Sequence, residues 1–269
     1  MPDRRAPDQG VIVRSLSAKL TAAGLAFLLA GCAGLFQRGK PAQPADYRWR
    51  AGGELAVGFA ETDITPVGSA YLGGFGLARS STGVHSRLKV RAMVLRVGAR
   101  NVAVVGVDNL GLQREDVDWI KRALVGFHNG DVLLCSSHTH AAPDLVGLWG
   151  FYTLTSGRDV DYLQLVRRQV VDAVQAALGS ARPAELMLGT ARIPPAGVLR
   201  NGRRPGVCNY RATALVCRDV RSGEPFGALL HVACHPELLS RRDTLVSADF
   251  VGELCDRWRA AGHGQAVFV

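Results

Sequence analysis

The chain has 269 residues, of which 48% are hydrophobic and 20% are charged, and its formal net charge is +9. This composition is ordinary for a globular protein. Its basic residues, mostly arginine, are scattered, with short pairs such as Arg203-Arg204 and Arg241-Arg242 in the domain. No helical basic face or aromatic-interleaved basic stripe is present, which argues against nucleic acid as a partner, although a positive surface would suit anionic lipids.

The first residues are predicted to carry an export signal. The apolar run Leu20–Ala30 follows basic residues and is too short to span a bilayer. It ends in Leu29-Ala30-Gly31-Cys32, which looks like a bacterial lipoprotein attachment motif. We therefore expect residues 1–31 to be a signal peptide and Cys32 to be a lipidated N-terminus that anchors the protein to a membrane. Because no aspartate follows Cys32, the expected location is the bacterial cell envelope, at the outer membrane.

The remainder is predicted to be a tether, residues 32–53, followed by one α/β domain, residues 54–269. Segments with strand-like patterns alternate with segments of helical period. This order predicts a mixed β-sheet with helices packed on it and an active-site rim at strand ends. The predicted strands are 54–60, 88–97, 101–107, 132–136, 184–191, 211–219, 226–233 and 265–269.

Three helices are predicted from spacing and caps. The first begins near Arg114, the second follows the capping residue Asp159 and stops at Gly179, and the third opens at Asp249. The apolar face expected on the first helix consists of Val117, Ile120, Leu124 and Phe127.

Two histidine clusters stand where predicted strands end. The first cluster, at the end of the predicted strand 132–136, is Ser136-Ser137-His138-Thr139-His140. The second, at the end of the predicted strand 226–233, is His231-Val232-Ala233-Cys234-His235. In an extended backbone, His138 and His140 point to the same side. Two imidazoles on one face, together with a third imidazole from another strand end, are typical ligands of a transition-metal site. A metal-free hydrogen-bonded histidine pair together with a core histidine is the alternative.

Five cysteines remain once Cys32 is lipidated, and the sequence has no Cys-x-x-Cys motif. A zinc ribbon is therefore unsupported, and the odd count leaves at least one thiol free in an oxidising compartment. Cys135 and Cys234 lie in apolar runs and are expected to be small core residues, with an accessory metal role as the alternative.

Several motifs occur in a recognisable order. Two motifs are specific for one protein family when they occur together: Asp63-Ile64-Thr65-Pro66 and His138-Thr139-His140-Ala141-Ala142-Pro143. Leu199-Arg200-Asn201, His235-Pro236 and Leu245-Val246-Ser247-Ala248-Asp249-Phe250 follow. From Val57 to the end, this order resembles the N-terminal catalytic domain of the neutral/alkaline non-lysosomal ceramidases.

The resemblance implies a zinc-dependent amidase that cleaves the N-acyl bond of ceramide to a sphingoid base and a fatty acid. It places His138 and His235 on Zn²⁺-ligand positions and His140 on an active-site histidine that is not the main ligand. It also places Asn201 in a substrate-binding Asn-Arg loop, although here Gly202 separates Asn201 from Arg203.

Two acidic residues beside the histidines are candidates for supporting roles. Asp108 and Asp249 stand at strand or loop ends and would orient the imidazoles by hydrogen bonds. A turn or helix cap is the alternative for each. The apolar residues after the first cluster would line a lipid-accepting mouth or equally cover the core; they are Leu145, Val146, Leu148, Trp149, Phe151 and Tyr152.

The family pattern continues beyond this sequence. There, a serine after the next strand, and a glutamate and a tyrosine further on, complete the site, so we expect the chain to be the front part of a longer protein. Two other functions stay open. One is a metal-dependent hydrolase of a different amide or ester, and the other is a lipid-anchored metal-binding protein without activity.

Overall fold

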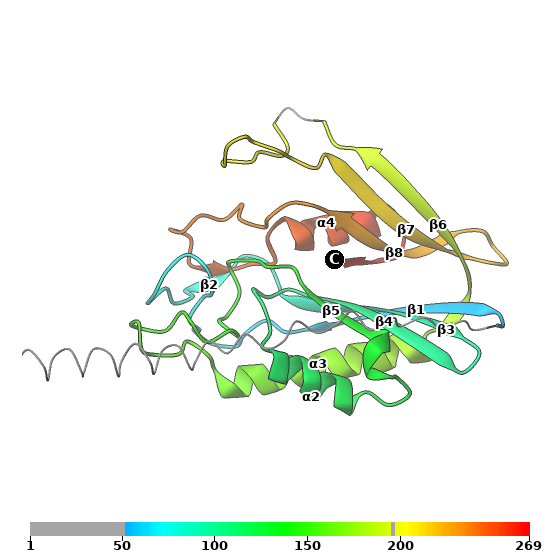
Figure 1. Ribbon diagram of the computed structural model, residues 1–269, viewed down its shortest axis with the longest axis horizontal. Coiled ribbons are helices and arrows are strands. Elements are labelled where there is room, and N and C mark those ends of the chain that lie inside the picture. Colours follow the sequence, from blue (N-terminus) through cyan, green and yellow to red (C-terminus); the bar gives the residue numbers. More distant parts are fainter. Residues whose placement is uncertain (1–51, 195–196) are drawn as a thin grey trace, which may run out of the picture. The chain divides into compact units, whose positions relative to one another are not determined.

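The computed structural model describes residues 52–194 and 197–269 (Figure 1). All the described residues belong to one unit, Arg50–Val269. The predicted signal peptide, most of the tether and Cys32 lie outside the described residues. This unit contains an eight-stranded mixed sheet with helices packed on it, which confirms the predicted α/β class.

The strands of the sheet run in the order β10-β8-β7-β6-β1-β3-β4-β5. The β4–β5 and β8–β10 pairs are parallel and the other pairs are antiparallel. Only two residue pairs, Ala56–Pro183 and Val57–Arg182, join β1 to β6, and beyond them the two halves of the sheet lie one above the other (Figure 1). The first half consists of β1 (Leu55–Asp63), β3 (Lys89–Val97), β4 (Arg100–Val107) and β5 (Val132–Ser136). The second consists of β6 (Arg182–Arg192), β7 (Arg211–Asp219), β8 (Pro225–Val232) and β10 (Gln265–Phe268).

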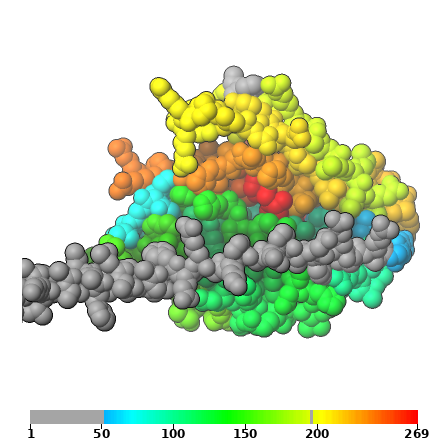
Figure 2. All heavy atoms as spheres, in the orientation of Figure 1, coloured from blue at the N-terminus to red at the C-terminus, as the bar shows by residue number. Residues whose placement is uncertain are grey.

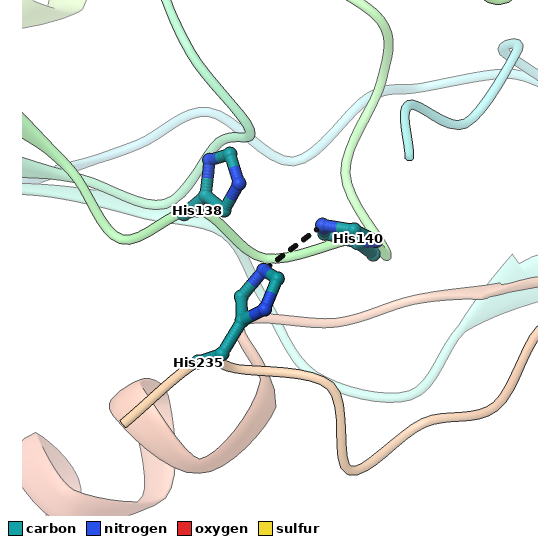
Figure 3. Close-up of side chains that lie close together, drawn as sticks. All are labelled: His138, His140 and His235. Atoms are coloured by element: carbon teal, nitrogen blue, oxygen red, sulfur yellow. Dashed lines mark hydrogen bonds between the residues drawn. The ribbon is translucent and has the colours of Figure 1, made fainter. Parts of the chain in front are cut away.

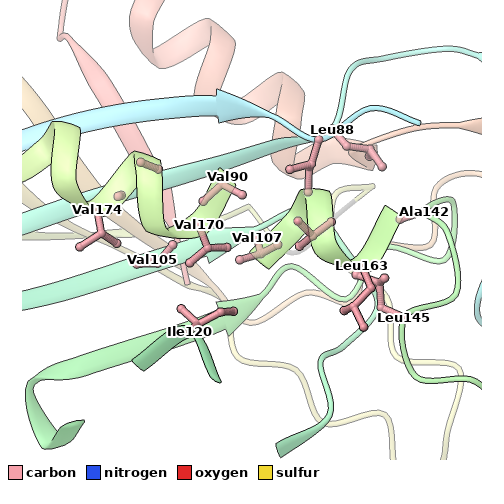
Figure 4. Packing of buried hydrophobic residues seen from close by; sticks show 14 of the residues in the cluster. Leu88, Val90, Val105, Val107, Ile120, Ala142, Leu145, Leu163, Val170 and Val174 are labelled. Atoms are coloured by element: carbon pink, nitrogen blue, oxygen red, sulfur yellow. The ribbon is translucent and has the colours of Figure 1, made fainter. Parts of the chain in front are cut away.

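Helices α2 (Arg114–Ala123) and α3 (Val160–Gly179) cover the outer face of the first half (Figure 1). The Asp159 side chain caps α3 by accepting a hydrogen bond from Tyr162 N at 3.0 Å, as the sequence predicts. Burial of each valine in this core contributes roughly 1.5–3 kcal/mol. Figure 4 shows the packing, which includes Val90, Val105, Val107, Ile120, Leu163, Val170 and Val174.

The second half of the sheet packs closely on the inner face of the first because glycines stand at the contact. A Cβ added to Gly106 on β4 would lie 2.5 Å from the carbonyl oxygen of Phe268. One added to Gly227 on β8 would lie 2.4 Å from the ring of Phe59. Helix α4 (Asp249–Ala260) packs against β8 and β10 through an apolar cluster that includes Val251 and Cys255.

A small parallel pair, β2 (Gly83–Val84) and β9 (Leu245–Val246), lies beside the main sheet. After β9 the chain bonds to a different segment, because Ser247 N donates a hydrogen bond to Ala141 O at 2.8 Å. Residues just before α4 are thereby bonded to the first histidine segment.

Two details of the sequence interpretation are wrong. Helix α2 ends at Ala123 because Leu124 turns to an extended backbone and Gly126 follows with a φ of 83°, so Phe127 is not on the helix. Cys234 lies in the loop after β8 and is half-buried, because the strand ends at Val232. All five cysteines in the described part of the chain are free. Within residues 52–194 and 197–269, no helix has the length and hydrophobicity needed to cross a membrane.

Candidate metal centre

The first histidine segment leaves the sheet at the end of β5. The parallel pairing of β4 and β5 continues past both strands, since His138 N donates to Asn109 O at 2.8 Å. The carboxyl ends of parallel strands meet at one sheet edge, which is where α/β proteins place their sites. His138 has a φ of 69°, a left-handed conformation that is uncommon for residues other than glycine. Such outliers cluster at functional sites.

The orientation of the His138 ring is fixed by a backbone carbonyl. Its Nδ1 lies 2.6 Å from the carbonyl oxygen of Leu110. A carbonyl oxygen only accepts hydrogen bonds, so Nδ1 carries the proton and Nε2 keeps its lone pair. A histidine that ligates a metal commonly holds its other nitrogen in this way.

A glycine-rich loop forms the wall behind His140. Gly74 has a φ of 107°, and a Cβ there would lie 2.4 Å from His140 Nδ1, so only glycine fits. The Phe75 ring contacts the His140 ring edge-on, with centroids 4.7 Å apart. Arg79 is buried, donates from Nη2 to the His140 carbonyl oxygen at 2.5 Å, and stacks its guanidinium over Phe75. The ring and the backbone of His140 are therefore both held in place.

The second histidine segment follows β8 and is anchored by an aspartate. His235 comes three residues after the strand ends at Val232. Asp249, at the start of α4, accepts hydrogen bonds from Leu238 N at 2.9 Å and Leu239 N at 3.2 Å. This clamp fixes the backbone immediately after the histidine motif.

The three imidazoles converge although they come from distant parts of the chain (Figure 3). One ring nitrogen from each of His138, His140 and His235 lies within 4.8 Å of the others. The Nε2 atoms of His140 and His235 are 3.1 Å apart, and the rings of His138 and His235 are stacked with centroids 5.0 Å apart. His138 and His235 are exposed, whereas His140 is half-buried.

This donor set fits a transition-metal ion. Zinc binds histidine nitrogens at about 2.0–2.1 Å, which brings the nitrogens of neighbouring ligands to within about 3–3.5 Å of one another in a tetrahedral site. His140 Nε2 and His235 Nε2 are 3.1 Å apart, and the nitrogen of His138 lies within 4.8 Å of both, so the three nitrogens are close enough to face one ion. Three imidazole nitrogens are also a donor set that zinc and copper commonly bind. The residues present therefore suit the ion that the sequence predicts.

Burial favours the neutral form of His140. Loss of solvent lowers the pKa of its imidazole, and the neighbouring His235, His138 and Arg79 lower it further. The carboxylate of Glu237 acts in the opposite direction, although burial is the larger influence. A neutral imidazole has a lone pair with which to bind a metal or accept a proton.

Sequence reasoning missed several residues of this site, among them Glu237 and Arg79. Glu237 Oε1 lies 3.1 Å from His140 Nδ1, and its Oε2 lies 3.5 Å from His235 Nδ1. Arg79, which holds the His140 carbonyl, is separated from it by 61 residues, so no local pattern marks it. The His235-Pro236-Glu237 triplet was the available signal for the first of these residues.

The two aspartates expected to orient imidazoles are placed differently. Asp108 is buried and bonds Arg91 Nη1 at 2.8 Å and Lys89 N at 2.9 Å, so its carboxylate is occupied by the sheet rather than by a histidine. This contact pairs two buried opposite charges, which explains why Asp108 faces Arg91. Asp249 binds backbone amides, as described above, and supports His235 only through the loop. The alternative role, in a turn or at a helix start, is the one that Asp249 has.

The predicted substrate-binding residues lie in the connection between β6 and β7. Asn201 donates from its side-chain amide to Val207 O at 2.8 Å and accepts from Arg203 N at 2.9 Å. Both Asn201 and Arg203 are exposed, and the loop that carries them projects from the surface (yellow in Figure 2). In the described structure, no hydrogen bond joins either residue to the three histidines.

Comparison with known proteins places the fold. No protein-family model and no curated protein matches the chain. The solved structure of neutral ceramidase from Pseudomonas aeruginosa is similar, with a TM-score of 0.67 and 21% sequence identity over 80% of this chain. The described domain shares its fold with part of that ceramidase. A ceramidase complexed with C2 is similar to the same extent, with a TM-score of 0.68 and 20% identity over 80% of this chain. The chain spans 38% and 37% of the length of these two proteins.

Proposed function

We propose that the protein is a zinc-dependent amidohydrolase that cleaves the N-acyl bond of ceramide-like lipids to a sphingoid base and a fatty acid. The observation that carries this proposal is the convergence of His138, His140 and His235 at strand ends, within 4.8 Å of one another. The similarity of the fold to neutral ceramidases supports the reaction class.

Each histidine has a distinct part in this proposal. His138 and His235 would hold the ion, since both are exposed at the rim and His138 has a free Nε2. A bound zinc ion polarises a carbonyl group and lowers the pKa of coordinated water toward about 7. His140, neutral and held from behind by Arg79 and Phe75, would move a proton or stabilise the oxyanion through Nε2.

Apolar side chains near the rim support a lipid substrate. Leu148, Phe151 and Tyr152 are more than half exposed, with values of 64%, 66% and 56%. Their loop is joined to the wall of His140, because Ala78 N donates to Gly150 O at 2.8 Å. Exposed apolar groups beside a polar site are suited to binding alkyl chains. Leu145 of the same predicted set is instead buried in the core.

The lipid anchor at Cys32 would bring this site to a membrane that contains its substrate. We propose a location in the bacterial cell envelope, at the outer membrane, with zinc as cofactor and no nucleic-acid partner. Acyl-chain labelling followed by mass spectrometry of the mature N-terminus tests the anchor. A mature protein that begins elsewhere, with an unmodified Cys32, would contradict it.

The activity is tested by release of fatty acid from ceramide in detergent by the zinc-loaded protein. A soluble amide and a soluble ester are assayed in parallel, and the H235A variant is the negative control. We expect release from ceramide that depends on both zinc and His235. Cleavage confined to the soluble substrates would favour the different-hydrolase alternative, and bound zinc without any cleavage would favour the binding protein.

A further inference from the structure

Glu237 is the carboxylate that contacts the imidazoles of this site in the described part of the chain. Its Oε1 lies 3.1 Å from His140 Nδ1 and its Oε2 lies 3.5 Å from His235 Nδ1. The opposite nitrogens of the same two rings, the Nε2 atoms, lie 3.1 Å from each other. The Glu237 carboxylate therefore lies on the Nδ1 side of both rings, whose Nε2 atoms face each other.

The backbone holds this carboxylate at its position. Glu237 N donates to His235 O at 3.0 Å, a three-residue turn that brings the Glu237 side chain back toward the His235 ring. Pro236 is the central residue of this turn, and its ring restricts φ to a value that the turn requires. The next two residues, Leu238 and Leu239, donate their amides to Asp249 Oδ2. The glutamate is thus fixed on both sides along the chain.

The third ring completes a pattern. The Nδ1 of His138 faces the carbonyl oxygen of Leu110, whereas those of His140 and His235 face the two oxygens of Glu237. Each imidazole then has an oxygen near its Nδ1, and an oxygen in that place favours the proton on Nδ1 and leaves Nε2 facing the shared site. The Glu237 oxygen lies off the N–H direction of His140, whose buried Nδ1 has no hydrogen bond. Because the Glu237 side chain is 37% exposed, it has room to turn onto that nitrogen.

We infer that Glu237 is a positioning residue, which orients His140 and His235 together so that the Nε2 of His235 faces the ion and the Nε2 of His140 faces the reacting groups beside it. This inference rests on the proposed function insofar as that function requires a metal ion. Glutamate suits the position because its two oxygens both accept hydrogen bonds. Glutamine has one accepting oxygen and one donating amide, so it can serve only one of the two rings.

The test is titration of the metal-free protein with Co²⁺, followed by its visible absorption band, in the wild type and in E237Q, E237A and E237D. We expect binding to weaken about 10-fold in E237Q and up to about 100-fold in E237A, the usual range for loss of a carboxylate behind a metal-bound histidine. In E237D, one oxygen still reaches one ring, so the loss should be no larger than in E237A. The band shape should be unchanged, because the ligands are unchanged.

The matched control is E253Q, which removes the same charge from an exposed pair with Arg257 on α4. It should bind Co²⁺ as the wild type does. Thermal unfolding of the metal-free proteins should be the same for E237Q and wild type, which separates positioning from a loss of stability.

The possible outcomes distinguish a failure of this inference from a failure of the proposed function. If E237Q binds Co²⁺ as tightly as the wild type, Glu237 does not position the rings. A changed absorption band would make Glu237 a direct ligand instead. If the wild type binds neither Co²⁺ nor Zn²⁺, the inference and the proposed function fail together. If the wild type binds metal, E237Q binds it less tightly and neither cleaves ceramide, the proposed function fails while the role of Glu237 stands.

Discussion

The Nε2 atoms of His140 and His235 lie 3.1 Å apart although 95 residues separate them in the chain. His140 follows the parallel strand β5 and His235 follows β8, and these strands belong to different halves of the sheet. The two histidines are therefore brought together because the second half of the sheet packs over the first. The following predictions depend on that arrangement.

Single histidine substitutions should separate metal binding from catalysis. H138A and H235A are expected to lose bound zinc together with hydrolysis, because each removes one of very few ligands. H140A should keep most of the zinc and lose about 10²–10⁴-fold in rate, the usual contribution of a proton-transfer group. Elemental analysis paired with fatty-acid release measures both effects. H128A, at an exposed histidine outside the site, is the control. Loss of zinc from H140A equal to that from H235A would make His140 a third ligand.

The glycine wall behind His140 should not tolerate a methyl group. In G74A, the new Cβ would lie 2.4 Å from His140 Nδ1, and the φ of 107° would be strained. We expect the His140 ring to be displaced and hydrolysis to fall at least 10-fold, a size typical for misplacing a catalytic group. G76A, where the nearest atom is the Arg241 guanidinium at 3.9 Å, is the control in the same loop. Equal activities in the two variants would show that the wall does not position His140.

The left-handed backbone at His138 should make one inactive variant more stable than another. H138G and H138A both remove the imidazole, but only glycine adopts a φ of 69° without strain. We expect H138G to exceed H138A by about 1 kcal/mol in the free energy of unfolding, measured by urea denaturation. The same pair at His140, which has no positive φ, should have the opposite order, because glycine there only adds flexibility to the unfolded chain. A common order at both positions would refute strain at His138.

The buried pair of Arg91 and Asp108 should matter for stability. The two side chains are 3% and 2% exposed, so D108A would leave an arginine buried without its partner. The expected loss is about 3–5 kcal/mol in the free energy of unfolding. D118A, which breaks the exposed pair with Arg114, should cost less than about 1 kcal/mol. Similar losses in the two variants would argue against a buried ion pair.

The sequence alone predicted the helices and strands that are marked by neighbouring residues. β5 spans Val132–Ser136 as predicted, because a short apolar run ends directly in polar residues. α3 spans Val160–Gly179, because an aspartate caps its start and a glycine closes its last turn. Phe127 was assigned to a helix because the apolar period continues past the point where the backbone of Leu124 becomes extended.

The candidate site was predictable only in part, for a physical reason. The three histidines could be found because each follows a strand-like run. Arg79 and Gly74 could not, because the loop that carries them reaches His140 through tertiary contacts. Asp108 was assigned to the histidines because it stands at the end of β4, whereas Arg91 on the adjacent strand β3 takes its carboxylate.

The hydrogen bonds around the first histidine segment bear on how an ion would be gained and lost. Thr139 is fully buried and donates to Ser247 O at 2.9 Å, while Ser247 N donates to Ala141 O at 2.8 Å. The first histidine segment is thus tied to the residues just before α4, and Asp249 of α4 in turn holds the amides that follow His235. In small zinc domains, by contrast, the metal supplies the folding free energy and chelators unfold the chain. Here a chelator should empty the centre and leave the slow amide exchange of its loops largely intact, so the protein could exchange one metal for another without refolding.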